Sequence, residues 1–557
     1  METTTKSRYL SMSVLFTSLF VTFLVTPFNS IDPVNLPKLC LLVVLSFASI
    51  GFAFSDIQFF KAKINRPVVF VLTVFIVQLL FVLIFDDRDF AYKFYGTFGR
   101  NTGFAAYLSL AFLFIISVIC SSKTLLKRYL LAILGSGAVL ALYGFFQSKG
   151  LDFYQISSGY GTNVFGTFGN PNFQSAFMGI TSAAALSLFL FSRISKLYRA
   201  CLFCLLVVSI YNISISSQQG YLNFTAGVVV ATVIFLFKSQ KPFLGWLAVV
   251  FSSFVGSLIF LGILNIGPLA QAVYKSSLQA RGFYWRAAIK MILEHPVFGV
   301  GMDGFGDEYL RFRTTDIAVV NSGITADTAH NIPLDIGSNG GFFLLTSYLA
   351  IVTLVVISII RVLKRNVEFN VIFTAIVAGW VAYQAQSLIS INQLGLGVWG
   401  WSLSGLIIGY ELRTRAESSV VNHKLTPSKK VTKEKVSSFV IVMTFLTTSL
   451  GIGIALPPYV AATKFYSALQ SGDPTIIQNA AYLKPNDRFR YLYVARALLE
   501  NKFESQAISV LRDASTIYPD SIDLWEMWIS VSSASVADVA RAKAEMKRLD
   551  PFNPEIK

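Results

Sequence analysis

Apolar segments long enough to cross a bilayer occupy most of this sequence, and they restrict its fold more than any other feature. A transmembrane helix needs roughly 20 mostly apolar residues. Only 14% of the residues are charged and 54% are hydrophobic, whereas about a quarter of a soluble domain is charged. The sequence therefore predicts an all-α polytopic membrane bundle of about thirteen transmembrane helices. The apolar windows begin near Tyr9, Leu36, Pro67, Thr102, Leu126, Pro171, Tyr198, Tyr221, Phe243, Gly341, Val371, Leu394 and Ser437.

Basic residues recur in every second loop between these windows. Short cytoplasmic loops of membrane proteins collect Lys and Arg, so the alternation predicts a cytoplasmic N-terminus. The loops expected outside are 86–101, 149–170 and the long stretch 265–340, together with everything after about Pro457. Membrane orientation thus accounts for the net charge of +16 and argues against nucleic acid as a partner. The basic loops are 61–66, 123–128, 193–199, 238–241, 361–365 and 413–435.

Composition divides the chain into four parts. We predict a membrane domain at 1–412, a basic cytoplasmic linker at 413–436, a last transmembrane helix at 437–460 and an extracytoplasmic helical domain at 461–557. In the last part, Pro485-Asn486 and Pro519-Asp520 have the spacing of tetratricopeptide helix pairs, about 34 residues. We expect tetratricopeptide-like hairpins that bind a protein partner or an acceptor. An unspecialised helical cap is the alternative.

Two external loops carry nearly the same phrase directly before an apolar helix. Residues 95–100 read YGTFGR and residues 165–170 read FGTFGN. In the second loop, Asn170 is a natural N-cap and Pro171 a natural first helical residue, so free backbone N–H groups could bind phosphate. Arg100 would add a charge beside the other helix start. Tight turns between spans are the alternative interpretation.

The long external loop contains a helix-like segment at 280–294. Its apolar residues Trp285 and Ile289 fall on one face, which we expect to be buried. Arg281 lies on that side, and a cation there is costly unless it binds an anion. Arg286 and Lys290 share another face, where they could meet lipid headgroups, and Arg286 is a second candidate for binding an anionic substrate.

His330 follows in the same loop, within the sequence AHNIP. A histidine titrates near neutrality and can take a proton from a hydroxyl group. Asp327 or Asp335 could orient its ring. A surface histidine without a role is the alternative.

A carboxylate cluster stands at the start of the first external loop, at the end of a predicted span. Asp86, Asp87 and Asp89 could hold a divalent cation, or they could form a solvated helix flank. We favour the flank and expect no metal site and no cofactor.

Four segments together resemble the O-antigen ligase and polymerase superfamily of bacterial membrane glycosyltransferases. They are residues 281–285, the turn 295–301, His330-Asn331 and the phrase at 166–172. The resemblance covers roughly residues 1–410. It implies a GT-C-like helical fold in the bacterial cytoplasmic membrane. It also implies metal-independent transfer of a glycan from an undecaprenyl-pyrophosphate carrier to an acceptor hydroxyl on the external face.

Carried over by position, the resemblance implies that Arg281 binds the pyrophosphate and His330 activates the acceptor. This chain departs from the family at SSQQG, residues 216–220, where many relatives carry an arginine. The amide of Gln219 can donate hydrogen bonds but carries no charge, so Arg100 or Arg286 would compensate. The predicted substrate-binding residues are Arg100, Asn170, Gln219, Arg286 and Asn331.

Several functions share this chemistry or this architecture. A ligase, a polysaccharide polymerase and a protein O-oligosaccharyltransferase would differ only in their acceptor, which can be a glycan, a lipid or a protein. A transporter or flippase of lipid-linked glycans is a rival from another class, although it would favour charged residues in mid-span and inverted repeats. A metal-dependent glycosyltransferase using Asp87 and Asp89, or a scaffold that presents the repeats, remains open.

Overall fold

The computed structural model describes residues 5–53, 57–62, 65–155, 164–263, 265–273, 276–320, 325–366, 368–421 and 437–556. Every regular element within these ranges is helical. In the described part of the chain, nine helices are long and apolar enough to cross a membrane by length and composition. The predicted all-α polytopic membrane fold is therefore confirmed.

Each predicted apolar window contains one helix. The long helices α7, α16, α18 and α19 exceed the windows that predicted them. The bounds are α1 (Thr5–Phe23), α2 (Asn35–Ala53), α4 (Arg66–Phe85), α6 (Phe104–Cys120), α7 (Lys123–Ser148), α8 (Pro171–Phe191), α9 (Lys196–Ser216), α10 (Gln219–Lys238), α11 (Pro242–Ile263), α16 (Ile332–Arg365), α17 (Val371–Ser387), α18 (Leu394–Val421) and α19 (Ser438–Ser471).

The outer surface of the helical bundle is apolar. Phe243 and Trp246 of α11 are 77% and 62% exposed, and Phe445 of α19 is 70% exposed. Water would penalise such a surface, whereas lipid tails solvate it, and the helices satisfy their own backbone hydrogen bonds. These side chains are placed to face the bilayer.

The predicted helix start at Gly340-Gly341 corresponds to a break inside α16. Gly341 has φ 76° and ψ −177°, a conformation that glycine adopts at little cost. A Cβ atom at this position would lie 2.6 Å from the carbonyl oxygen of Pro296, and the N–H of Phe342 donates to that oxygen at 2.7 Å. The break separates the first turns of α16, which follow His330, from the apolar span.

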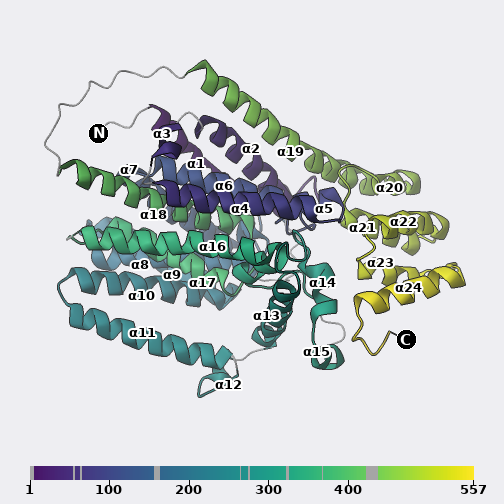
Figure 1. Cartoon of the computed structure of the whole chain (residues 1–557). Helices are drawn as coiled ribbons and strands as arrows, with labels where there is room; N and C mark the ends of the chain where they lie inside the picture. Colours follow the sequence, from purple (N-terminus) through teal and green to yellow (C-terminus); the bar gives the residue numbers. More distant parts are fainter. Residues whose placement is uncertain are drawn as a thin grey trace.

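Short helices cover the expected external end of the bundle. α13 (Ser276–Glu294), α14 (Phe305–Phe312) and α15 (Thr315–Val320) belong to the long loop, and α5 (Phe90–Tyr95) belongs to the first external loop. Figure 1 shows these elements on the same side of the bundle as the C-terminal helices. The other short elements are α3 (Ile57–Lys61), the 3-10 helix η2 (Gly166–Phe168) and α12 (Ala270–Val273).

The C-terminal helices form a separate layer beyond the bundle (Figure 1). They share a hydrophobic core that includes Tyr491, Leu511 and Trp525. α19 continues into this layer, past the predicted boundary at 460, and α18 extends to Val421, inside the predicted linker. The rest of that linker, 422–436, lies outside the described residues. The helices are α20 (Pro474–Ala480), α21 (Arg488–Glu500), α22 (Glu504–Ile517), α23 (Ile522–Ser530) and α24 (Val536–Leu549).

Two helix pairs follow the two proline motifs of the C-terminal layer. α21 packs against α22, and α23 packs against α24, as expected of helical hairpins. Pro485-Asn486 precedes the first pair and Pro519-Asp520 the second. The assignment of these hairpins to the tetratricopeptide class stays a prediction.

Candidate active site

The backbone on both sides of His330 is held by side chains of α16. His330 adopts a left-handed conformation, with φ 50°. A carboxylate oxygen of Asp335 accepts a hydrogen bond from the N–H of Ala329 at 3.1 Å. On the other side, the Asn331 side chain accepts from the N–H of Leu334 at 3.0 Å and caps the helix. These bonds set the position from which the imidazole projects.

The imidazole of His330 lies in a partly buried aromatic environment. Its centroid is 5.6 Å from that of the Tyr284 ring, and the two planes are inclined by 32°. Burial and the nearby charge of Arg281 lower the pKa of His330 to about 4. The ring is therefore neutral at neutral pH. Within the described residues it makes no hydrogen bond, so its unprotonated nitrogen can accept a proton from a ligand.

Arg100 and Asp327 form a bidentate ion pair next to His330. Arg100 Nε and Nη2 donate to the two Asp327 oxygens at 2.7 and 3.1 Å. Burial works against ionisation of Asp327, but the guanidinium of Arg100 holds the pKa of this carboxyl below its ordinary value. The pair connects the first repeated phrase to the long loop. Of the two carboxylates considered for orienting His330, Asp327 acts on its charge, whereas Asp335 binds a backbone N–H.

Arg281 approaches His330 from α13. Burial lowers the pKa of Arg281, and its charge also acts on His330. In the part of the chain that the structure describes, no hydrogen bond or ion pair engages its guanidinium. A half-buried cation without a carboxylate partner is poised to bind an anion.

The buried face of α13 differs from the predicted one. Ala287, Ala288 and Met291 are fully buried in a small core with α14, whereas Ile289 is 47% exposed. The expectation of a buried face was therefore wrong for Ile289, whereas Trp285 is partly buried and its indole nitrogen is fully buried. The small side chains of Ala287 and Ala288 allow α13 to pack closely on α14.

The remaining predicted substrate-binding residues lie in different settings. Arg286 is exposed, with its guanidinium carbon 5.3 Å from the centroid of the Phe283 ring. Asn170 caps α8 by accepting from the N–H of Asn172 at 2.8 Å, as predicted for the second repeated phrase.

Gln219 is connected to the His330 turn through α17. Its amide nitrogen donates to the side-chain oxygen of Gln386. Two residues later, the carbonyl of Leu388 accepts from the Asn331 amide at 2.9 Å. The buried side-chain oxygen of Gln219 has no hydrogen-bond partner among the described residues. Gln219 and Asn331 thus both contact the C-terminal end of α17. Their amide groups are largely used in these contacts.

His330 also lines a cleft of about 360 Å³ that the membrane domain shares with the C-terminal helices. The C-terminal residues of this cleft could not be found from the sequence. The proline motif at 519–520 indicated a helix pair, but nothing local indicated which surface the pair would face. These residues are Arg488, Asp520, Ser521, Ile522, Asp523 and Leu549.

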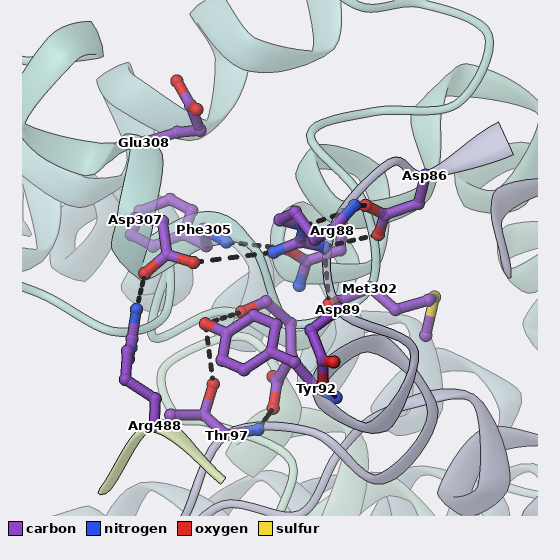
Figure 2. A network of polar contacts seen from close by, with 12 residues as sticks. Asp86, Arg88, Asp89, Tyr92, Thr97, Met302, Phe305, Asp307, Glu308 and Arg488 are labelled. Atoms are coloured by element: carbon purple, nitrogen blue, oxygen red, sulfur yellow. Dashed lines mark hydrogen bonds and ion pairs between the residues drawn. The ribbon is translucent and has the colours of Figure 1, made fainter. Parts of the chain in front are cut away.

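A chain of ion pairs joins the C-terminal helices to the external loops, as Figure 2 shows. Arg488 of α21 pairs with Asp307 of α14. The other oxygen of Asp307 lies 3.7 Å from Arg88, which pairs with Asp86 at 2.6 Å. Both guanidinium groups lie 5.1 Å from the ring centroid of Tyr92. The network anchors α21 beside the cleft.

The same network separates the carboxylates that were considered as metal ligands. Asp86 pairs with Arg88, while Asp89 caps α5 through the N–H groups of Ala91 and Tyr92. The predicted solvated flank is therefore wrong for Asp86, whose side chain is only 5% exposed. Among the described residues no three His, Cys, Asp or Glu side chains gather as a metal site would require.

Two further contacts fasten the C-terminal layer. Arg313, fully buried, donates to both oxygens of Asp550 at 2.9 and 2.7 Å. The rings of Phe98 and Phe489 stack with centroids 3.7 Å apart and planes 2° apart. The C-terminal helices thus pack on the loops that carry Arg100 and His330.

This arrangement combines a neutral base, His330, with a cation, Arg281, that has no ion-pair partner among the described residues. The imidazole can accept a proton from a hydroxyl group in the cleft, and the guanidinium can stabilise negative charge that develops on a leaving group.

A family model described as O-antigen ligase matches residues 204–349. The matched segment contains Gln219, Arg281, Arg286, His330 and Asn331, and it excludes Arg100, Asn170 and the C-terminal helices. A comparison with curated proteins gave no significant match.

Proposed function

We propose that this chain is a multi-pass membrane glycan transferase of the O-antigen ligase superfamily, a proposal that the match at 204–349 and the apolar helices support. It takes a glycan from an undecaprenyl-pyrophosphate carrier and joins it to an acceptor hydroxyl on the external face of the bacterial cytoplasmic membrane. The observation that carries this proposal is the placement of His330 beside Tyr284 of α13, near Arg281 of the same helix. Among the described residues, neither the imidazole nor the Arg281 guanidinium has a hydrogen-bond or ion-pair partner.

The reaction needs one base and one stabiliser of negative charge. His330 takes the proton of the acceptor hydroxyl, whose oxygen forms a new bond to the anomeric carbon of the donor. The bond from that carbon to the pyrophosphate oxygen breaks, and the carrier leaves with the electron pair. Arg281 stabilises the charge of the departing pyrophosphate. Arg286 stands at the expected membrane surface, where a lipid-linked pyrophosphate would approach.

Glycan transfer in living cells tests this proposal. We expect His330→Ala and Arg281→Ala, at matched expression, to reduce transfer by about 10²- to 10⁴-fold and about 10²- to 10³-fold. Lipid-linked glycan should accumulate outside. His295→Ala and Lys290→Ala are the matched controls, since each replaces the same kind of side chain in α13 or at its end, and both should keep transfer.

The accumulated material also identifies the acceptor class. Single repeat units on the carrier indicate a polymerase, long chains on the carrier indicate a ligase, and loss of glycan from a protein indicates protein glycosylation. If both variants transfer glycan like the intact protein, His330 is not the base, and a lipid-linked glycan transporter or a scaffold becomes the better interpretation.

A further inference from the structure

The cleft at His330 is built by two parts of the chain that are far apart in sequence. Tyr284 and Asp327 line it from the long loop, and Ser521 and Asp523 line it from the start of α23. The Arg488–Asp307 ion pair and the buried Arg313–Asp550 pair hold the C-terminal helices on the loops. The C-terminal residues therefore line the cleft in this structure. The C-terminal domain therefore forms part of the cavity that the candidate base faces.

Hydrogen-bonding capacity is left unused along this cleft. Asp307, Asp327 and Asp520 are paired with arginines. Asp523, in contrast, is exposed, and within the described ranges no hydrogen bond or ion pair engages it. Ser521 is 2% exposed, and its Oγ has no hydrogen-bond partner in the part of the chain that the structure describes.

A buried hydroxyl without a partner is costly in a finished structure. Together with the unbonded imidazole of His330, it gives the cleft a donor and acceptors for a polar ligand.

The charge of the cleft disfavours a pyrophosphate as that ligand. Three of its four lining carboxylates are paired with arginines, and Asp523 is the one that has no ion-pair partner among the described residues. An unpaired carboxylate disfavours an anion and accepts hydrogen bonds from neutral hydroxyl groups. Arg281, which does not line this cleft, offers the opposite charge from α13.

We propose that this cleft is the acceptor subsite and that it binds a neutral saccharide end of the acceptor. The inference rests on the proposed transferase function. The carboxylate of Asp523 accepts hydrogen bonds from sugar hydroxyls, the Oγ of Ser521 adds a hydrogen bond, and the ring of Tyr284 beside His330 offers an apolar surface to a sugar face. A volume of about 360 Å³ is within the usual range of small-ligand sites. The C-terminal domain thus selects the acceptor by forming one wall of its site.

Saturation-transfer NMR on the full-length protein in micelles tests this assignment, with a panel of neutral disaccharides as probes. We expect one or more to bind the intact protein and to bind Asp523→Asn about tenfold more weakly, because a hydrogen bond to a charged acceptor is lost. Glu526→Gln is the matched control, since Glu526 is exposed one turn later on α23 and does not line the cleft. It should bind the disaccharides like the intact protein.

Two further probes separate the alternatives. Methylene diphosphonate, a stable pyrophosphate analogue, should show no dependence on Asp523; dependence on this residue would place the donor in the cleft and overturn the assignment. A serine-containing peptide that binds in an Asp523-dependent manner, while no disaccharide does, would overturn the saccharide assignment in favour of a protein acceptor.

Transfer measured on the same variants distinguishes this inference from the proposed function. If His330→Ala abolishes transfer but no disaccharide depends on Asp523, the proposed function stands and the acceptor subsite lies elsewhere. If His330→Ala leaves transfer intact, the transferase proposal itself fails.

Discussion

The imidazole of His330 is subject to opposing influences that decide how it can act. Burial, Arg281 and Arg100 lower its pKa, while Asp327 raises it, and the result is a pKa of about 4. A general base acts in its unprotonated form, so a lowered pKa keeps His330 competent at neutral and mildly acidic pH. Its weaker basicity is compensated by a fixed position at the cleft.

We expect the decrease of kcat/KM at acid pH to follow the lowered pKa of His330. kcat/KM should stay level from neutral pH to well below 6.5 and fall as pH approaches about 4. Asp327→Asn removes the anion that raises the pKa of His330, so it should move this decrease to lower pH. Recovery of activity after return to neutral pH excludes irreversible inactivation by acid, and an unchanged circular dichroism spectrum at the acid pH excludes unfolding. A decrease near pH 6.5 in the intact enzyme would contradict the assignment of His330 as a buried, neutral base.

The ion pair between Arg313, at the end of α14, and Asp550, at the end of α24, is the least exposed ion pair of the described residues. The side chains of Arg313 and Asp550 are 0% and 2% exposed. Removal of one partner of a buried pair leaves a charge without compensation in a medium that solvates it poorly. The exposed pair between Arg548 and Glu545, at 42% and 29%, lacks this penalty.

We predict that Asp550→Ala destabilises the contact between the C-terminal helices and the long loop by about 3–5 kcal/mol. Glu545→Ala, the control on the same helix, should cost about 0–1 kcal/mol. Thermal unfolding in micelles, followed by limited proteolysis, measures the stability of both variants. We expect the C-terminal helices to be cleaved at a lower temperature only in Asp550→Ala. Equal stability of the two variants would show that this pair does not fasten the layer.

At the scale of the whole molecule, the cleft requires the long loop and the C-terminal domain to share one side of the membrane. They lie at the same end of the bundle (Figure 1), and the ion pair between Arg488 and Asp307 connects them. The alternation of basic loops predicts that this side is external.

A topology reporter tests this orientation. We expect a reporter fused after Gly472 to be active outside the cell membrane and a reporter fused after Arg365 to be active inside. An internal signal after Gly472 would move the cleft to the cytoplasmic side and remove the basis for external transfer.

The sequence by itself determined that this chain is an all-α membrane protein, and it located the apolar helices, of which nine among the described residues are long and apolar enough to cross a bilayer. Both follow from local properties, because the length of an apolar run matches the thickness of the bilayer core. The cap at Asn170 was likewise predictable, since a cap depends on a few neighbouring residues. At Gly341 the sequence indicated the start of the apolar span, but not that a helix already precedes it.

Only the tertiary structure decided how the site residues meet. Arg100 and Asp327 pair although they are 227 positions apart, and Asp523 reaches the cleft of His330 from the C-terminal helices. Neither contact leaves a periodicity or a motif in the sequence. The packing of whole helices and loops brings these side chains together, and that packing depends on shape and charge summed over many residues rather than on any local pattern.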